Sequence, residues 1–247
     1  MSQQATFKSR KMAHVGVACA LLMSTAAQAQ NLSFAAGRDF PASGTDTSVN
    51  LVVGGDFRDN GKTDVVTVTT GALQGGSRVS ILLGNGDGTL QAPSTITSSA
   101  QLINAIAVGD FNGDGKPDLV TVSTAAPPSI SVFLGNGDGT FGAPVVTTLA
   151  TPPQLTGALV VADFNVDGKS DVALTASAPQ VNAGSVEVLI SNGDGTFKAP
   201  VIYPIASISP LLAVGDLNGN GTPDLITGAV HKSPFFWGTA TAHFKQP

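Results

Sequence analysis

The nine residues DFNGDGKPD, at positions 110–118, decide the fold, because variants of this stretch occur at nearly constant intervals along the chain. The other copies are DFRDNGKTD at 56–64, DFNVDGKSD at 163–171 and DLNGNGTPD at 216–224. Their first residues lie 54, 53 and 53 positions apart. A fixed period of this size is typical of an architecture that builds one structural unit several times.

A second motif lies between the copies of the first. It occurs three times, as LGNGDGTLQAP at 83–93, LGNGDGTFGAP at 134–144 and ISNGDGTFKAP at 190–200. Asn and Gly readily adopt the positive φ that tight hairpin turns need. We therefore predict that each Asn-Gly-Asp-Gly stretch is a turn rather than a second cation site.

The turn signals divide each repeat into short strands. In the second repeat, apolar or alternating runs that favour strands occupy 104–109, 119–124, 129–135 and 140–148. No sustained helical periodicity is present after the first thirty residues. Four-stranded units at this period are typical of propeller blades, so we predict an all-β fold of the β-propeller type, with four blade-like repeats of four antiparallel strands.

The ends of the repeat array bear on ring closure. The predicted repeats are 49–102, 103–155, 156–207 and 208–247, and a further outer strand is predicted at 31–42. The fourth repeat lacks the Asn-Gly-Asp-Gly turn. Known propellers have roughly four to eight blades, so four repeats favour an open or incomplete ring. The alternatives are a small closed ring and a larger assembly, such as a homodimer in which two chains complete one ring.

The N-terminus has the pattern of a secretory signal peptide. Lys8, Arg10 and Lys11 precede an apolar run at 12–23, and Ala-Gln-Ala follows at 27–29. A run of 12 residues is shorter than the roughly 20 that span a bilayer. We predict a signal peptide at 1–29 and a secreted, periplasmic or cell-surface protein at 30–247, with no membrane insertion after cleavage.

Charge and cysteine content narrow the function. The chain has 12 Lys and Arg against 17 Asp and Glu, and removal of the three basic residues of the signal peptide leaves 9 − 17 = −8. A net negative charge without a basic cluster argues against nucleic acid as a partner. The single cysteine, Cys19, would leave with the signal peptide, so no disulfide stabilises the predicted mature chain.

Most acids lie in the repeated motifs: 14 of the 17 belong to the four nine-residue stretches or the three glycine-rich turns. Alternating oxygen side chains around a glycine bend supply the hard ligands that Ca²⁺ prefers. We therefore predict Ca²⁺ as the cofactor, held by side chains at motif positions 1, 3, 5 and 9 and by the backbone carbonyl at position 7. In the second copy these residues are Asp110, Asn112, Asp114, Lys116 and Asp118.

The other three copies match this ligand pattern to different degrees. The third copy matches fully, with Asp163, Asn165, Asp167, Lys169 and Asp171. The fourth has one charge fewer, with Asp216, Asn218, Asn220, Thr222 and Asp224. In the first copy Arg58 stands at position 3 and supplies no acceptor, which leaves Asp56, Asn60, Lys62 and Asp64. The alternative is a turn satisfied by its own backbone hydrogen bonds, which explains the residue types but not their fixed spacing.

The sequence carries no catalytic motif. Only His231 and His243 remain after signal cleavage, and no metalloprotease, nucleophile-elbow or phosphate-loop pattern is present. The one aromatic cluster, at 235–237, is read as core or a terminal strand. We predict that the protein is not an enzyme.

The alternation of D-x-N-x-D-G-x-x-D with N-G-D-G-T-F-x-A-P resembles the FG-GAP, or VCBS-type, repeats of integrin alpha subunits and of many secreted bacterial proteins. The resemblance covers about residues 31–247. It implies a β-propeller with Ca²⁺ in the loop between the first two strands of each blade. Propellers of this family usually have seven blades, so the four found here bear on closure.

These observations give one leading hypothesis and two alternatives. The leading hypothesis is a secreted, non-enzymatic, calcium-binding propeller that acts in adhesion or protein binding. The first alternative is a carbohydrate-binding, lectin-like propeller, and the second is an ancillary module of a polysaccharide-degrading system. The expected partner is therefore an extracellular protein or a glycan.

Overall fold

The computed structural model describes seven stretches of the chain, all within the unit Phe40–Pro247: residues 48–70, 76–99, 102–125, 127–149, 154–178, 183–205 and 211–228. Every regular element in these stretches is a β-strand, and none of them holds a helix long and apolar enough to cross a membrane. The predicted signal peptide, the predicted outer strand at 31–42, both histidines of the mature chain and the aromatic cluster at 235–237 lie outside the described residues.

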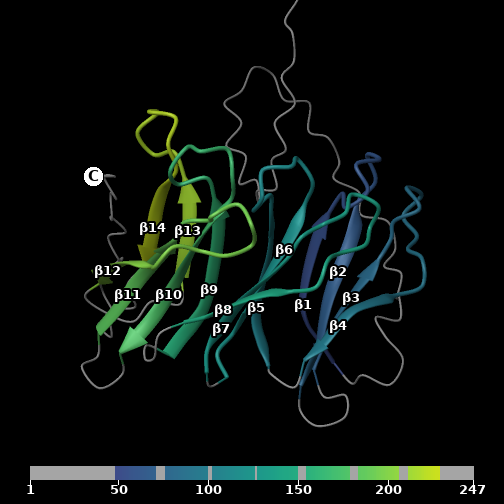
Figure 1. The fold of residues 1–247 in the computed structure, drawn as a ribbon, viewed down its shortest axis with the longest axis horizontal. Helices are drawn as coiled ribbons and strands as arrows, with labels where there is room; N and C mark the ends of the chain where they lie inside the picture. Colours follow the sequence, from purple (N-terminus) through teal and green to yellow (C-terminus); the bar gives the residue numbers. More distant parts are fainter. Residues whose placement is uncertain are drawn as a thin grey trace, which may run out of the picture. The chain divides into compact units, whose positions relative to one another are not determined.

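The described strands form three four-stranded sheets and one two-stranded sheet, all antiparallel, in which consecutive strands of the chain are hydrogen-bonded neighbours (Figure 1). The first sheet contains β1 (Ser48–Gly55), β2 (Asp64–Thr70), β3 (Ser77–Leu82) and β4 (Ser94–Ser99). The second contains β5 (Ile103–Gly109), β6 (Asp118–Ser123), β7 (Ser129–Phe133) and β8 (Val145–Thr148). The third contains β9 (Gln154–Ala162), β10 (Asp171–Ala178), β11 (Ala183–Leu189) and β12 (Val201–Ile205), and the fourth contains β13 (Leu211–Gly215) and β14 (Asp224–Gly228).

The all-β, blade-like prediction is confirmed by these sheets, and the predicted strands of the second repeat differ from the observed ones mainly in the last. A strand was expected over 140–148, but β8 begins at Val145. Phe141 forms only an isolated bridge with Gly135. Pro144 lies between the two segments and lacks the N–H that a continuous ladder needs, which accounts for the interruption.

Successive sheets pack face to face through apolar side chains. Val66 and Val68 of β2 share one buried cluster with Leu119 of β6. On the opposite face of β6, Val120 and Val122 join the cluster between the second and third sheets. Because β6 is covered on both faces, all six of its residues are buried, as expected for a central strand with two packed faces.

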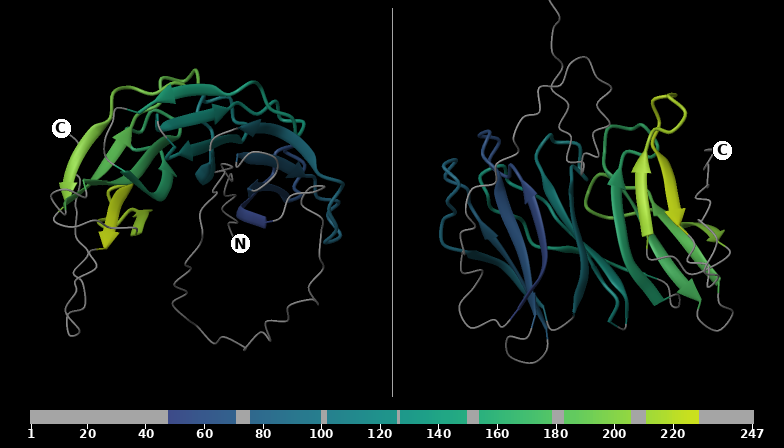
Figure 2. Two further views of the ribbon diagram at one scale, coloured as in Figure 1. Left: turned by 90° about the horizontal axis from the view of Figure 1, so that it is seen from below. Right: turned by 180° about the vertical axis from the view of Figure 1, so that it is seen from behind.

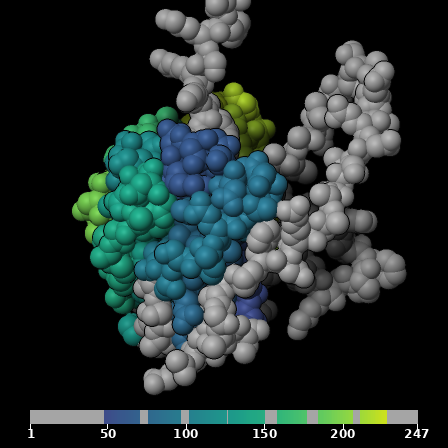
Figure 3. Space-filling view, turned by 90° about the vertical axis from the view of Figure 1, so that its right-hand side faces the viewer, coloured from purple at the N-terminus to yellow at the C-terminus, as the bar shows by residue number. Residues whose placement is uncertain are grey.

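The first strand of each sheet lies at the junction with the next sheet. Contacts join β1 to β5, β5 to β9, and β9 to β13 (Figure 2). In space-filling view, the side chains of the first and second sheets meet without a gap at their junction (Figure 3). This arrangement, with the first strands adjacent, is that of neighbouring propeller blades.

Candidate functional site

Each nine-residue motif forms the loop between the first two strands of a sheet. We call these loops the first to fourth Asp loops; they comprise residues 56–64, 110–118, 163–171 and 216–224. Their position agrees with what the family resemblance implied. The four loops can therefore be compared position by position.

The carboxylate at position 1 organises the backbone of each loop. Asp110 accepts hydrogen bonds from the N–H groups of Gly113 at 2.7 Å, Asp114 at 3.2 Å and Gly115 at 2.8 Å. In the other three loops the position 1 carboxylate likewise accepts hydrogen bonds from the N–H groups of positions 5 and 6. These carboxylates are Asp56, Asp163 and Asp216. The alternative of a self-satisfied turn is thus correct for the hydrogen bonds of this residue.

The side chains at positions 3 and 5 also accept backbone hydrogen bonds. In the second loop, Asn112 Oδ1 accepts the N–H of Asp114 at 3.0 Å, and Asp114 Oδ1 accepts the N–H of Lys116 at 2.9 Å. Each bond occupies one lone pair, and a carboxylate has about four acceptor sites in total. The loop oxygens therefore keep acceptor capacity after the backbone bonds are made.

The position 9 aspartate is buried and fixes the loop to the sheet. Asp118 has 0% exposure; its Oδ2 accepts the N–H of Phe111 at 2.8 Å, and its Oδ1 accepts the N–H of Gly135 at 2.7 Å. Asp171 makes the same pair of bonds with Phe164 and Ser191. Position 9 thereby connects the Asp loop to the start of the glycine-rich turn.

Burial makes these two carboxylates unusual. Loss of solvent raises the pKa of Asp118 to about 6, although two backbone N–H bonds oppose the rise and the carboxylates of Asp110 and Asp114 add to it. The pKa of Asp171 is also raised to about 6 by burial, in the same setting. Among the described residues, no Lys or Arg forms an ion pair with either of them.

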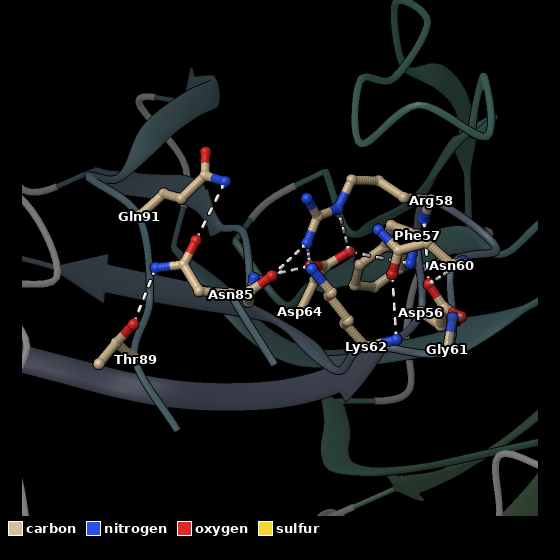
Figure 4. A network of polar contacts seen from close by, with 11 residues as sticks. Asp56, Phe57, Arg58, Asn60, Gly61, Lys62, Asp64, Asn85, Thr89 and Gln91 are labelled. Carbon is tan, nitrogen blue, oxygen red and sulfur yellow. Dashed lines mark hydrogen bonds and ion pairs between the residues drawn. The ribbon is translucent and has the colours of Figure 1, made fainter. Parts of the chain in front are cut away.

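The first Asp loop differs at position 3. The Arg58 guanidinium contacts Asp64, the position 9 carboxylate, with Nη2 2.6 Å from Oδ1 and Nε 3.3 Å from Oδ2 (Figure 4). Nη2 also donates to the carbonyl oxygen of Gly84 at 2.6 Å. A positive charge therefore faces the buried carboxylate of the first loop.

The position 7 lysines, predicted only as carbonyl ligands, also use their side chains. Lys116 Nζ lies 3.5 Å from Asp114 Oδ2, and Lys169 Nζ lies 3.2 Å from Asp167 Oδ2. Both pairs are partly exposed, so each contributes little to stability. The pKa of Asp167 is lowered, first by the hydrogen bond from Asn165 and then by the N–H of Lys169. Asp167 therefore stays ionised to a lower pH than the buried position 9 aspartates Asp118 and Asp171.

The glycine-rich stretches are turns, as predicted. In the first, the Asn85 N–H donates to the Thr89 carbonyl at 2.9 Å, and the Thr89 N–H donates to Asp87 Oδ1 at 2.9 Å. The corresponding bonds occur in the other two copies. These hydrogen bonds are enough to explain why the same residue spacing recurs in the three turns.

Position 4 of each Asp loop has a left-handed backbone. Gly113 and Gly219 occupy it with φ of 76° and 73°, whereas the third loop has Val166 with φ of 58°. A left-handed β-branched residue is strained by roughly 1–2 kcal/mol, and Val166 gains little from packing because it is 64% exposed.

Val166→Gly is therefore expected to raise the free energy of unfolding by about 1 kcal/mol, since relief of strain exceeds the entropy that glycine adds to the unfolded chain. Thermal denaturation should show a melting temperature higher by about 2–4 °C. Val201→Gly is the matched control: Val201 is also exposed but lies in β12, where glycine should destabilise. A lower melting temperature for Val166→Gly would contradict the assignment of strain.

The Asp loops also contact the next sheet, a feature that the sequence analysis missed. Phe57 and Phe111, at position 2, pack edge to face on Phe141 and Phe197 of the following sheet, with centroid distances of 5.4 and 6.0 Å. The signal was present, because Phe recurs at position 2 and after the glycine-rich turn.

Backbone hydrogen bonds reinforce the same junctions. Ser170 of the third loop donates its N–H to the Asp110 carbonyl at 2.7 Å and accepts the Asp110 N–H on Oγ at 2.9 Å. Ser191 Oγ donates to the Phe111 carbonyl at 2.7 Å, and the Gly139 N–H donates to the Phe57 carbonyl at 3.0 Å. Each of the first two Asp loops is therefore shared between two sheets.

The Asp loops offer carboxylate, amide and carbonyl oxygens as possible metal ligands. Within the described stretches, no cluster of three or more His, Cys, Asp or Glu side chains is placed to hold a metal ion. Coordination would instead need the mixed donor set of one Asp loop: carboxylate, amide and backbone carbonyl oxygens, which suit Ca²⁺. In the first loop, the Arg58 guanidinium contacts the position 9 carboxylate and places a positive charge beside it.

Sequence comparison with known families agrees with this organisation. A family model described as FG-GAP-like repeat matches the chain three times, at residues 56–121, 122–174 and 167–227. The matches extend over more than half of the 247 residues. No curated protein matches the chain. Repeats of this family form β-propeller-like modules that generally bind proteins and are typically non-enzymatic, and the chain belongs to the FG-GAP-like repeat family.

Proposed function

We propose that this protein is a secreted, non-enzymatic module that binds Ca²⁺ through its second, third and fourth Asp loops and presents its sheets for adhesion to an extracellular protein. One observation carries the metal part: Asp118 and Asp171 are buried carboxylates without a described ion-pair partner, whereas Asp64 at the same position faces Arg58. A bound divalent cation would stabilise the charged form of such groups.

The ligands follow from the positions of the side chains. Besides the position 9 aspartates, the second loop offers Asp110, Asn112 and Asp114 with the carbonyl of Lys116, and the third and fourth loops offer the equivalent residues. When bound, Ca²⁺ would supply positive charge and geometric order but no reaction. Extracellular modules bind this ion with dissociation constants of about 10⁻⁴ to 10⁻³ M.

Calcium titration of metal-free protein at pH 7.5 tests the proposal. We expect three bound ions by calorimetry and elemental analysis. At tenfold excess of free ion each site adds about 1.4 kcal/mol, so the melting temperature should rise. Asp114→Ala should remove one ion, because it deletes a charged ligand. No heat of binding together with an unchanged melting temperature would refute calcium binding.

Asp138→Ala is the matched control for the metal count. Asp138 lies in the glycine-rich turn of the same sheet and accepts the N–H of Thr140 at 2.8 Å. Removing it deletes an acid close in sequence to the second loop but outside the proposed ligand set. The number of bound ions should stay at three, and a loss here would assign the metal to the turn.

Two further measurements test secretion and binding. Export with N-terminal sequencing should give Gln30 as the first residue, as the Ala-Gln-Ala site predicts. The protein-binding part rests on membership of a family whose repeats generally bind proteins. Cross-linking of the calcium-loaded protein on the producing cells, followed by mass spectrometry, should identify a protein partner. Binding confined to a glycan array would instead identify a lectin.

A further inference from the structure

The backbone of the first Asp loop is folded like those of the other three. Asp56 accepts the N–H groups of Asn60 at 3.1 Å and Gly61 at 2.6 Å, as Asp216 accepts those of Asn220 and Gly221 in the fourth loop. The loss of a ligand at position 3 has therefore left these two hydrogen bonds in place. What distinguishes the first loop is the charge that it carries.

Arg58 fills the side of the loop that faces the buried carboxylate. Its guanidinium contacts three oxygens, the two of Asp64 and the carbonyl of Gly84, at 2.6 to 3.3 Å (Figure 4). The side chains of Arg58 and Asp64 are 17% and 0% exposed. A two-point contact between guanidinium and carboxylate is both strong and directional.

The same guanidinium is incompatible with a calcium ion in this loop. Arginine has five N–H donors, no acceptor and a permanent positive charge. A cation bound by Asp56 and Asp64 would meet that charge at close range and would lack the oxygen that Asn112 offers in the second loop. The donor set of the first loop therefore does not fit Ca²⁺.

We infer that Arg58 is a built-in cation: it takes the place of the metal in the first Asp loop and pairs with Asp64 at any calcium concentration. The contrast between a metal in the other loops and Arg58 in the first rests on the proposed calcium function. The ion pair by which Arg58 stabilises the first loop does not depend on that proposal. Arg58 also lies at the junction with the second sheet, because a Cβ added at Gly139 would come within 3.3 Å of its Cγ. Arg58 thus supplies its charge where the first loop meets the second sheet.

Hydrogen exchange of the unmodified protein gives the first test. Removing calcium with chelator at pH 7.5 should increase deuterium uptake in peptides covering 110–118, 163–171 and 216–224, and leave 56–64 unchanged. An equal increase in the first loop would overturn the inference. Unchanged uptake in all four loops would refute the calcium proposal instead, and the role of Arg58 would then be decided by the variants below.

Two substitutions separate charge from ligation. Arg58→Asn restores an oxygen at position 3 and gives the first loop the acceptor pattern of the fourth, so it should bind one calcium ion more than the unmodified protein. Arg58→Met keeps the length of the stem without charge or acceptor and should gain no ion. In chelator, Arg58→Met should melt about 5 °C lower than the parent, because Asp64 is left buried without its partner. Arg58→Asn should lose less, because the equivalent Asn218 donates its amide to Asp224 at 3.2 Å in the fourth loop.

Added calcium then distinguishes the variants. Calcium should bind the first loop of Arg58→Asn and raise its melting temperature to that of the parent. The melting temperature of Arg58→Met should stay below that of the parent. Lys62→Met is the control, since it removes a positive charge from an exposed position of the same loop and should shift the melting temperature by less than about 1 °C. Parent-like melting of Arg58→Met in chelator, or no extra ion in Arg58→Asn, would overturn the inference.

Discussion

Replacing Phe111 by Ala is expected to lower the free energy of unfolding by about 3–5 kcal/mol. Phe111 has 0% exposure, belongs to the cluster between the second and third sheets, and contacts Phe197 edge to face. The substitution leaves a cavity at a junction that also holds the Asp110–Ser170 hydrogen bonds. Urea denaturation in excess calcium should therefore show a midpoint far below that of the parent.

Leu217→Ala is the matched control for Phe111→Ala. Leu217 occupies position 2 of the fourth Asp loop but is 54% exposed. Its truncation should change the free energy of unfolding by no more than about 0.5 kcal/mol. Similar losses for the two variants would show that position 2 acts within its own loop rather than between sheets.

Metal-free protein is expected to be more stable at pH 5 than at pH 7.5. Burial raises the pKa values of Asp118 and Asp171 from 3.8 to about 6, so the folded state holds protons that the unfolded chain has released between about pH 4 and 6. The free energy of unfolding therefore falls as the pH rises through this window. Between pH 5 and 7.5 the difference is about 1.4 kcal/mol for each carboxyl group, because only about one pH unit of the window is crossed.

Calcium should oppose this trend, because its ligands must be ionised and binding is therefore stronger above pH 6. Burial also raises the pKa of Glu187 in β11, which adds a trend of the same sign that calcium leaves in place. Melting temperatures of metal-free and calcium-loaded protein at pH 5, 6 and 7.5 measure both effects. A metal-free protein whose melting temperature rises over this range would refute the assignment.

Asp118→Asn identifies one source of the pH trend. It removes one of the two titrating loop carboxyls, so the change in melting temperature between pH 5 and 7.5 should shrink by about half, apart from the share of Glu187. Asp138→Asn serves as control, because the hydrogen bond from the Thr140 hydroxyl lowers the pKa of that exposed group below this window. Its pH trend should equal that of the parent.

The sequence was sufficient for the repeat period, for most strands of the second repeat and for the position of the Asp loops. These features depend on local patterns: the Asp, Asn and Gly spacing, the Asn-Gly turns and the Val/Thr-rich runs between them. Family comparison confirms the repeats. The calcium ligands stay a prediction, because the loop oxygens contact backbone N–H groups in the structure.

Other properties of the loops depend on residues far apart in the chain. Asp118 receives the N–H of Gly135, 17 positions away, and Arg58 reaches the carbonyl of Gly84, 26 positions away. No periodicity in the sequence shows that the first bond is made to a buried carboxylate. Nor does any show that the second helps to hold the Arg58 guanidinium beside Asp64. The sequence analysis saw Arg58 as a missing ligand, whereas the structure shows it as an ion-pair partner.

The link between Asp110 and Ser170 has a consequence for how the protein unfolds. Because one sheet's loop is fixed by a residue 60 positions later in the next sheet, opening either sheet breaks bonds in both. Repeat arrays of this kind behave as a row of units with nearest-neighbour coupling. An ion that tightens the second loop would then strengthen the interaction free energy between neighbouring sheets rather than the stability of a single sheet. The denaturation midpoint would move to a higher denaturant concentration, and the transition would become steeper.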